Sequence, residues 1–176
     1  MDAHQLKATV RNVPNFPKQG IVFRDITTLL KDSTAFRAVS EILHEKYAPA
    51  GITKVVGIES RGFIFGAILA NQLGAGFVPA RKPGKLPGET VRQEYRLEYG
   101  SDAVEIHKDA IQGSDRVLLH DDLLATGGTM SATAKLVANM GGKIIGISFL
   151  IELTFLHGRD KLKGYDVSSI IRYDSE

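Results

Sequence analysis

The chain has 176 residues, 43% hydrophobic and 24% charged, which is the composition of one folded domain with a sizeable core. Its 22 basic and 20 acidic residues leave a net charge of +2, too small to indicate nucleic-acid binding from bulk electrostatics. The lack of cysteine excludes a disulfide framework, a thiolate nucleophile and a cysteine zinc site. With no apolar run of membrane-spanning length and no leader-like amino terminus, we expect a single cytoplasmic domain over residues 1–176 that has no membrane contact.

The amino-terminal thirty residues do not follow one periodicity. Leu6, Val10 and Val13 recur at helical spacing, which predicts a short amphipathic helix over residues 2–12. Residues 14–20 are rich in Pro, Asn and Gly and predict a turn, and residues 21–26 then favour an extended segment. From the residues alone, Arg24 and its neighbour Asp25 would form an exposed ion pair of little energetic value.

From residue 32 onward, buried strand patterns alternate with helical ones. Asp32 or Ser33 can cap a helix that runs to about residue 47. Further strands are expected at residues 54–58, 76–80, 117–119, 144–151 and 167–172, and further helices near 63–73, 130–140 and 158–163. This alternation predicts an α/β fold with an open, mostly parallel sheet flanked by helices. Such sheets bind ligands at the carboxyl ends of their strands.

Two turns at that edge carry cations that could hold an anion. Arg61 follows the strand at 54–58, and residues 81–89 place three cations among two prolines and two glycines. Ordinary surface charge is the alternative explanation of either turn, and the less favoured one. Residues 90–99 alternate polar with apolar side chains, and residues 104–106 look like their partner strand. We therefore predict a flexible loop and hairpin hood over about residues 82–106 that can exclude water from a site.

The most informative stretch is the one that follows the apolar run Val117–Leu119. Asp121 and Asp122 come next, and Ala125-Thr126-Gly127-Gly128-Thr129 then leads into a helical pattern. The glycines let the backbone approach an anion closely, and the amides of the helix's first turn point into the same space. Adjacent strand residues point to opposite faces, so the two acids should bind separate sugar hydroxyls and not share a proton. The predicted ligand is a ribose with a 5′-phosphate.

This stretch resembles the phosphoribosyl-diphosphate (PRPP) fingerprint of the type I phosphoribosyltransferases, and its ending resembles the adenine-specific members. The turn Glu-Ser-Arg-Gly-Phe, the loop Arg-Lys-Pro-Gly-Lys-Leu-Pro-Gly and the later Leu-Glu-Tyr-Gly are similar to the same enzymes. His120 departs from the small apolar residue that is usual in the family at that position. The resemblance covers nearly the whole chain, from about residue 14 to 161.

The resemblance implies transfer of a phosphoribosyl group from PRPP to adenine, giving AMP and pyrophosphate in purine salvage. It implies that residues 1–30 cover the base, that the chain forms a homodimer, and that Mg²⁺ is held mainly by PRPP oxygens and water, with no dedicated protein metal site. Glu98 would be the catalytic group that handles the proton. Ribose and 5′-phosphate would be bound by Asp121, Asp122, Ala125, Thr126, Gly127, Gly128 and Thr129. Pyrophosphate would be bound by Ser60, Arg61, Arg81, Lys82 and Lys85. Adenine would be bound by Val22, Phe23, Arg24 and Leu153.

Two alternatives remain open at this point. The first is a phosphoribosyltransferase for hypoxanthine or guanine, although those enzymes commonly carry an Asp before the Thr-Gly where this chain has Ala125. The second is a regulator that keeps the PRPP site and binds nucleic acid. The complete set of cations and the small net charge argue against that regulator, and a gel-shift assay would decide.

Overall fold

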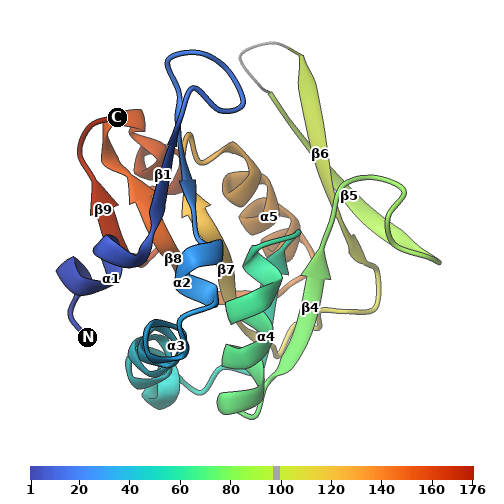
Figure 1. Cartoon of the computed structure of the whole chain (residues 1–176). Coiled ribbons are helices and arrows are strands. Elements are labelled where there is room, and N and C mark those ends of the chain that lie inside the picture. The colour runs from blue at the N-terminus through green and yellow to red at the C-terminus, as the bar shows by residue number, and fades with distance from the viewer. Residues whose placement is uncertain (97–99) are drawn as a thin grey trace.

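The computed structural model describes residues 1–96 and 100–176 and confirms an α/β fold built on a parallel sheet (Figure 1). The sheet has five parallel strands in the order β4-β3-β7-β8-β9. Their bounds are β3 Lys54–Ile58, β4 Gly76–Ala80, β7 Arg116–Leu124, β8 Lys143–Leu153 and β9 Val167–Tyr173. Each strand falls where an apolar run predicted one, because strands covered on both faces need apolar side chains throughout.

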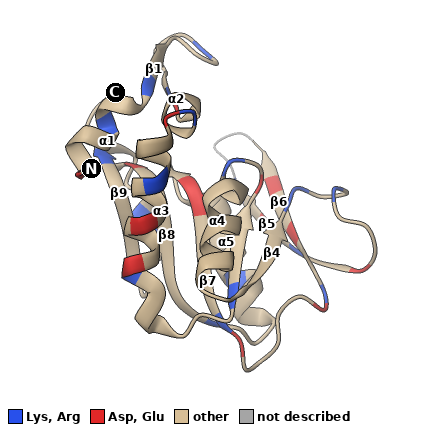
Figure 2. Ribbon diagram, turned by 60° about the horizontal axis from the view of Figure 1, so that its bottom comes forward, with Lys and Arg blue, Asp and Glu red and all other residues tan. Residues whose placement is uncertain are grey.

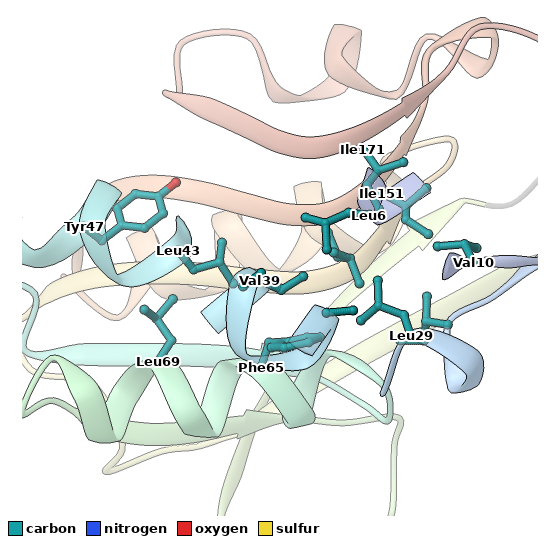
Figure 3. Packing of buried hydrophobic residues seen from close by; sticks show 14 of the residues in the cluster. Leu6, Val10, Leu29, Val39, Leu43, Tyr47, Phe65, Leu69, Ile151 and Ile171 are labelled. Atoms are coloured by element: carbon teal, nitrogen blue, oxygen red, sulfur yellow. The ribbon is translucent and has the colours of Figure 1, made fainter. Parts of the chain in front are cut away.

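Helices α3 (Ser33–Tyr47) and α4 (Gly62–Gln72) cover one face of this sheet. The Asp32 carboxylate accepts hydrogen bonds from the amides of Thr34 and Ala35, so the predicted amino-terminal cap of α3 is confirmed. Figure 3 shows side chains from these helices and from the amino-terminal segment packing together beneath the sheet. Phe65, Leu69 and Val39 are at most 1% exposed in this cluster.

Helix α5 (Gly128–Asn139) covers the opposite face and shares it with a hairpin. The hairpin strands β5 (Thr90–Arg96) and β6 (Ser101–His107) pair in an antiparallel register and project beside the sheet in Figure 1. Val104 and Ile106 of β6 are buried in the same core as α5, so the hairpin is anchored at its base. The predicted hairpin is confirmed for its described residues.

The amino-terminal segment differs from its prediction. Helix α1 spans only Ala3–Thr9, and β1 (Arg11–Pro14) pairs antiparallel with β2 (Val22–Asp25). The predicted helix to residue 12 was therefore too long, because pairing with a distant strand outweighs the local apolar spacing. A short helix α2 (Thr27–Leu30), which was not predicted, follows β2.

Three 3₁₀ turns, at Ala48–Ala50, Thr154–Leu156 and Gly158–Leu162, complete the described elements. Basic and acidic positions are interspersed along the ribbon in Figure 2. Within residues 1–96 and 100–176, no helix has the length and apolar character needed to cross a membrane.

Candidate active site

The candidate site is built at the carboxyl end of β7, which is longer than predicted and continues through both acids to Leu124. The loop Ala125–Thr129 leads from β7 into α5 and lines a small cavity of about 90 Å³. The first amides of α5 lack partners within the helix and are available to an anion there. The structure therefore brings together every residue predicted for the ribose and the 5′-phosphate.

Close backbone packing fixes the shape of this loop. Gly127 has a φ of 75°, a conformation that L side chains rarely adopt. A Cβ atom on Gly127 would collide with the carbonyl oxygen of Gly158, and a Cβ on Gly158 would collide with that of Ala125. Neither obstacle is a flexible side chain, so the loop cannot relax around a substitution.

Asp121 and Asp122 both line a larger cavity of about 480 Å³ beside the loop. The amide of Asp122 donates to Oδ1 of Asp121 at 2.8 Å, and Arg61 Nε lies 2.9 Å from Oδ2 of Asp122. Burial raises the pKa of Asp121 well above its usual value, and the neighbouring Asp122 charge raises it further. Burial also raises the pKa of Asp122, although the Arg61 guanidinium opposes that shift. The charge of Asp122 thus acts on Asp121, an interaction that strict strand alternation did not predict.

Ser60 and Arg61 enter the same cavity from the turn between β3 and α4. The Arg61 guanidinium also stacks 4.9 Å from the centre of the Phe23 ring, and that ring meets the edge of Phe16 at 5.2 Å. One cation therefore joins an acid of the predicted ribose site to the segment predicted to hold the base.

The basic loop after β4 is organised by Glu59, which was not predicted. Glu59 accepts hydrogen bonds from Arg81 Nε at 2.9 Å and from the Lys82 amide at 2.6 Å. Burial opposes the change, but the Lys82 amide and the Arg81 guanidinium lower the pKa of Glu59 below its usual value. Arg81 and Lys82 line the 480 Å³ cavity, whereas Lys85 lies outside its described lining. Glu59 is the first residue after β3, and that position was the available signal.

The same loop is also tied to the hairpin. The backbones of Arg81 and Glu105 exchange hydrogen bonds of 3.0 and 2.7 Å, and the Glu105 carboxylate accepts from the Gly84 amide at 3.1 Å. Tyr95 and Asp102 of the hairpin line the 480 Å³ cavity as well. In the sequence these two residues read only as an alternating strand position and a turn residue.

The predicted adenine residues are not equivalent in the structure. The Arg24 guanidinium donates to Asn12 Oδ1 at 2.7 Å and to the Ser175 carbonyl at 3.2 Å, and it lies 4.0 Å from the Tyr173 ring centre. Its side chain is therefore buried in the fold, and the interpretation of Arg24 and Asp25 as an exposed ion pair is wrong; Asp25 pairs with Arg11.

The backbone of β2 is the part of this segment that remains for a base. The Val22 amide donates to the Glu176 carboxylate at 2.9 Å. Leu153 ends β8 and is buried in the core beneath α3 and α4. Glu98, the predicted catalytic group, lies outside the described residues, so its role stays a prediction.

His120, the departure noted in the sequence, is fully buried in β7 directly before the acids. Its Nδ1 lies 2.8 Å from Ser148 Oγ, and Nε2 has no hydrogen-bond partner among the described residues. Burial lowers the pKa of His120 to about 4, so the ring is neutral near pH 7. Gly66 of α4 packs near this ring, since a Cβ there would lie in ordinary van der Waals contact with it at 3.7 Å.

The donor set suits Mg²⁺ carried by an anionic substrate. Carboxylate oxygens are the ligands that Mg²⁺ prefers, and Asp121 and Asp122 both line the 480 Å³ cavity, where Arg61 Nε lies 2.9 Å from Asp122 Oδ2. Among residues 1–96 and 100–176, no group of three or more His, Cys, Asp or Glu side chains is placed to hold a metal ion by itself. The two acids of the cavity could therefore offer oxygen ligands to a cation that binds together with the substrate.

Comparison with known proteins identifies the family. Residues 25–174 match the model of the phosphoribosyl transferase domain. The chain is 57% identical to adenine phosphoribosyltransferase of Solibacter usitatus, over 96% of this chain and 98% of that protein. Adenine phosphoribosyltransferase of Thermoanaerobacter pseudethanolicus has a similar structure, with a TM-score of 0.94, 53% identity and coverage of 97% and 99%.

A second solved structure, the Giardia lamblia enzyme complexed with 9-deazaadenine, has a TM-score of 0.93, 42% identity and 99% coverage of both chains. The family match spans most of the chain, and the relatives align along almost their full length. The chain therefore belongs to the phosphoribosyltransferase family, among its adenine phosphoribosyltransferases.

Proposed function

We propose that this site transfers the 5-phosphoribosyl group of PRPP to adenine, releasing AMP and pyrophosphate, as a step of purine salvage. The observation that carries the proposal is one cavity of about 480 Å³ in which the acids Asp121 and Asp122 face Arg61, Arg81 and Lys82. A ribose that carries anions at both ends needs acceptors at its centre and donors on either side. Acids, cations and Thr129 of the loop Ala125–Thr129 all line this cavity, which supports the proposal.

In this proposal the loop Ala125–Thr129 holds the 5′-phosphate through backbone amides and the hydroxyls of its two threonines. Asp121 and Asp122 accept hydrogen bonds from the ribose hydroxyls. Ser60, Arg61, Arg81 and Lys82 bind pyrophosphate, and Lys85 joins them through the mobile part of its long side chain. Glu59 keeps Arg81 and Lys82 in place, since both donate to its carboxylate.

The chemical step moves the anomeric carbon from pyrophosphate to a nitrogen of adenine. The C1′–oxygen bond breaks with its electrons on pyrophosphate, positive charge develops on the ribose, and the base nitrogen closes on C1′. Arg61, Arg81 and Lys82 stabilise the charge that collects on the leaving group, which is where preorganised donors contribute most. Mg²⁺ bound with PRPP would neutralise part of the same charge. Glu98 is proposed to accept the proton that the base loses.

Base selection is assigned to the backbone of β2. The Val22 carbonyl would accept a hydrogen bond from the adenine amine. The Arg24 amide would donate one to adenine N1. Phe23 and Leu153 would contact the ring. Hypoxanthine presents the opposite polarity at both positions, and each buried unpaired group costs about 1–3 kcal/mol. Apolar contacts would hold either purine, so the backbone polarity should decide.

The test is a base panel with PRPP and Mg²⁺, measuring AMP from adenine and IMP from hypoxanthine. The proposal expects adenine to be preferred by roughly 10⁴ in kcat/KM, as sites built on such hydrogen bonds allow. Comparable rates for the two bases would contradict the adenine assignment and leave a phosphoribosyltransferase of broader specificity.

We further propose that the chain forms a homodimer and that it works in the cytoplasm. Only its family membership supports these two points. Sedimentation equilibrium of the purified chain tests the first point. A mass of one chain at micromolar concentration would contradict it.

A further inference from the structure

Two hairpin residues contact donors on both sides of the 480 Å³ cavity. Tyr95 of β5 and Asp102 of β6 lie directly opposite each other in the hairpin register, and both line the cavity. The Thr129 hydroxyl donates to Tyr95 Oη at 3.1 Å. On the other side, Lys82 Nζ lies 3.2 Å from Asp102 Oδ2. The hairpin thus bridges two loops across the cavity. One is the loop Ala125–Thr129, called the phosphate loop below, and the other is the basic loop after β4.

The charges along this bridge are well defined. The Ala103 amide lowers the pKa of Asp102, burial opposes that change, and Lys82 lowers the pKa further, so Asp102 is an anion. Hydrogen bonding to Asp102 raises the pKa of Lys82, which stays a cation. Burial raises the pKa of Tyr95, and the Thr129 hydroxyl opposes that change, so the phenol is neutral. An anionic side chain therefore faces Lys82, one of the cations that the proposed function assigns to pyrophosphate.

The donors at the two ends of this bridge are those that the proposed function assigns to PRPP. Thr129 has one hydroxyl hydrogen, so when it donates to a 5′-phosphate oxygen its present hydrogen bond to Tyr95 is lost, unless the Tyr95 hydroxyl turns and donates to Thr129 Oγ1. Lys82 has three hydrogens, so it can keep some contact with Asp102 while it binds pyrophosphate. The Asp102 charge would then lie beside a like-charged ligand, and nearby like charges repel each other.

We propose that Tyr95 and Asp102 are affinity-setting residues of the PRPP site, which hold Thr129 and Lys82 and compete with the two ends of the substrate for them. The inference rests on the proposed function. Asp102 weakens the binding of pyrophosphate and takes Lys82 back as that product leaves. Tyr95 likewise weakens the binding of the 5′-phosphate, because it holds the Thr129 hydroxyl. The pair favours release of products, a step that limits turnover in many enzymes.

The test measures each end separately by calorimetry in the presence of Mg²⁺. Asp102→Asn should tighten pyrophosphate binding roughly three- to tenfold, because a unit charge near the ligand is removed at small cost in shape. Its affinity for ribose 5-phosphate should be unchanged. Tyr95→Phe keeps the ring beside Gly128 and should tighten ribose 5-phosphate about two- to threefold, with pyrophosphate binding unchanged.

Glu94→Gln is the matched control, because it removes one charge from the same hairpin at an exposed side chain that pairs with Arg92. It should leave both affinities at wild-type values. Near-ultraviolet circular dichroism establishes that each variant is folded.

Weaker or unchanged pyrophosphate binding in folded Asp102→Asn would overturn the inference, since a supporting role for Asp102 predicts weaker binding. If the wild type makes AMP and Asp102→Asn fails to tighten pyrophosphate, only this inference falls. If the wild type binds neither PRPP nor pyrophosphate, the proposed function falls with it.

Discussion

The two loops that are proposed to bind the anions of PRPP are held in shape by different means. The phosphate loop Ala125–Thr129 is fixed by backbone packing against Gly158, where even one added methyl group would collide with a carbonyl oxygen. The basic loop Arg81–Glu89 is held by acids on other elements, namely Glu59, Asp102 and Glu105. Its Gly84 has a φ of 76°, close to that of Gly127, but has open space around it.

This difference indicates what each loop can do. A loop fixed by its backbone presents amides in one arrangement and suits the part of the substrate that does not react. A loop held partly by side-chain pairs can exchange the most exposed of them, Lys82 with Asp102, for a ligand, because exposed pairs contribute only about 0–1 kcal/mol. It suits the end of the substrate that departs.

The largest expected effect comes from placing the same substitution in both loops. Gly127→Ala should lower kcat/KM by about 10² or more, since a shift of roughly 1 Å in a positioning group has that cost. Gly84→Ala has a similar backbone strain of about 1–2 kcal/mol but no collision, so its kcat/KM should stay within a few-fold of wild type. Steady-state kinetics with PRPP measures both. Equal losses at the two glycines would remove the contrast between the loops.

A smaller effect is expected at Arg61, which contacts both the acid pair and the base segment. Arg61→Ala should weaken PRPP binding by about tenfold to a hundredfold, because a charge-assisted hydrogen bond contributes about 1.5–3 kcal/mol. Arg61→Lys, which keeps the charge but loses the planar fork, should fall in between. PRPP affinity measured by calorimetry, with circular dichroism as the folding control, is the readout. Wild-type affinity in a folded Arg61→Ala protein would rule out the assigned role.

The smallest effect on turnover, but a measurable one on stability, concerns His120 beneath the phosphate loop. The pKa of His120 is about 4 in the folded protein, against an ordinary value of 6.5. Between these pH values the unfolded chain binds a proton at His120 and the folded protein does not. Stability therefore falls as the pH drops from 6.5 to 4, by up to about 3 kcal/mol from this group. His120→Val removes that contribution.

Urea unfolding at pH 7 and pH 4.5 measures the contribution of His120 to the pH dependence of stability. The drop in unfolding free energy between these pH values should be about 2–3 kcal/mol smaller in His120→Val than in wild type. Substitution of the exposed His4 by Val serves as the control and should behave like wild type. Equal pH dependence in all three proteins would show that His120 carries no such penalty.

Much of this molecule was predictable because its main features are local in sequence. Apolar runs such as Val55–Ile58 mark strands that are buried on both faces, and the acid pair with its Thr-Gly-Gly-Thr turn is contiguous. The strand Arg11–Pro14 was missed because its polar residues and proline become a strand only through pairing with β2. Tyr95 and Asp102 were missed for the same reason, because each acts through a partner on another element and no spacing along the chain encodes that contact. Glu59 was also missed, although its place directly after β3 was a usable signal.

The central claim is that the backbone-fixed loop holds the end of PRPP that stays and the ion-paired loop holds the end that leaves. A crystal structure of this chain with PRPP and Mg²⁺ tests it directly. The account predicts the 5′-phosphate on the amides of Ala125–Thr129, the ribose hydroxyls on Asp121 and Asp122, and pyrophosphate on Arg61, Arg81 and Lys82. It further predicts that Lys82 has moved its ammonium from Asp102 toward pyrophosphate. A 5′-phosphate bound to the basic loop, or ribose hydroxyls away from both acids, would contradict it.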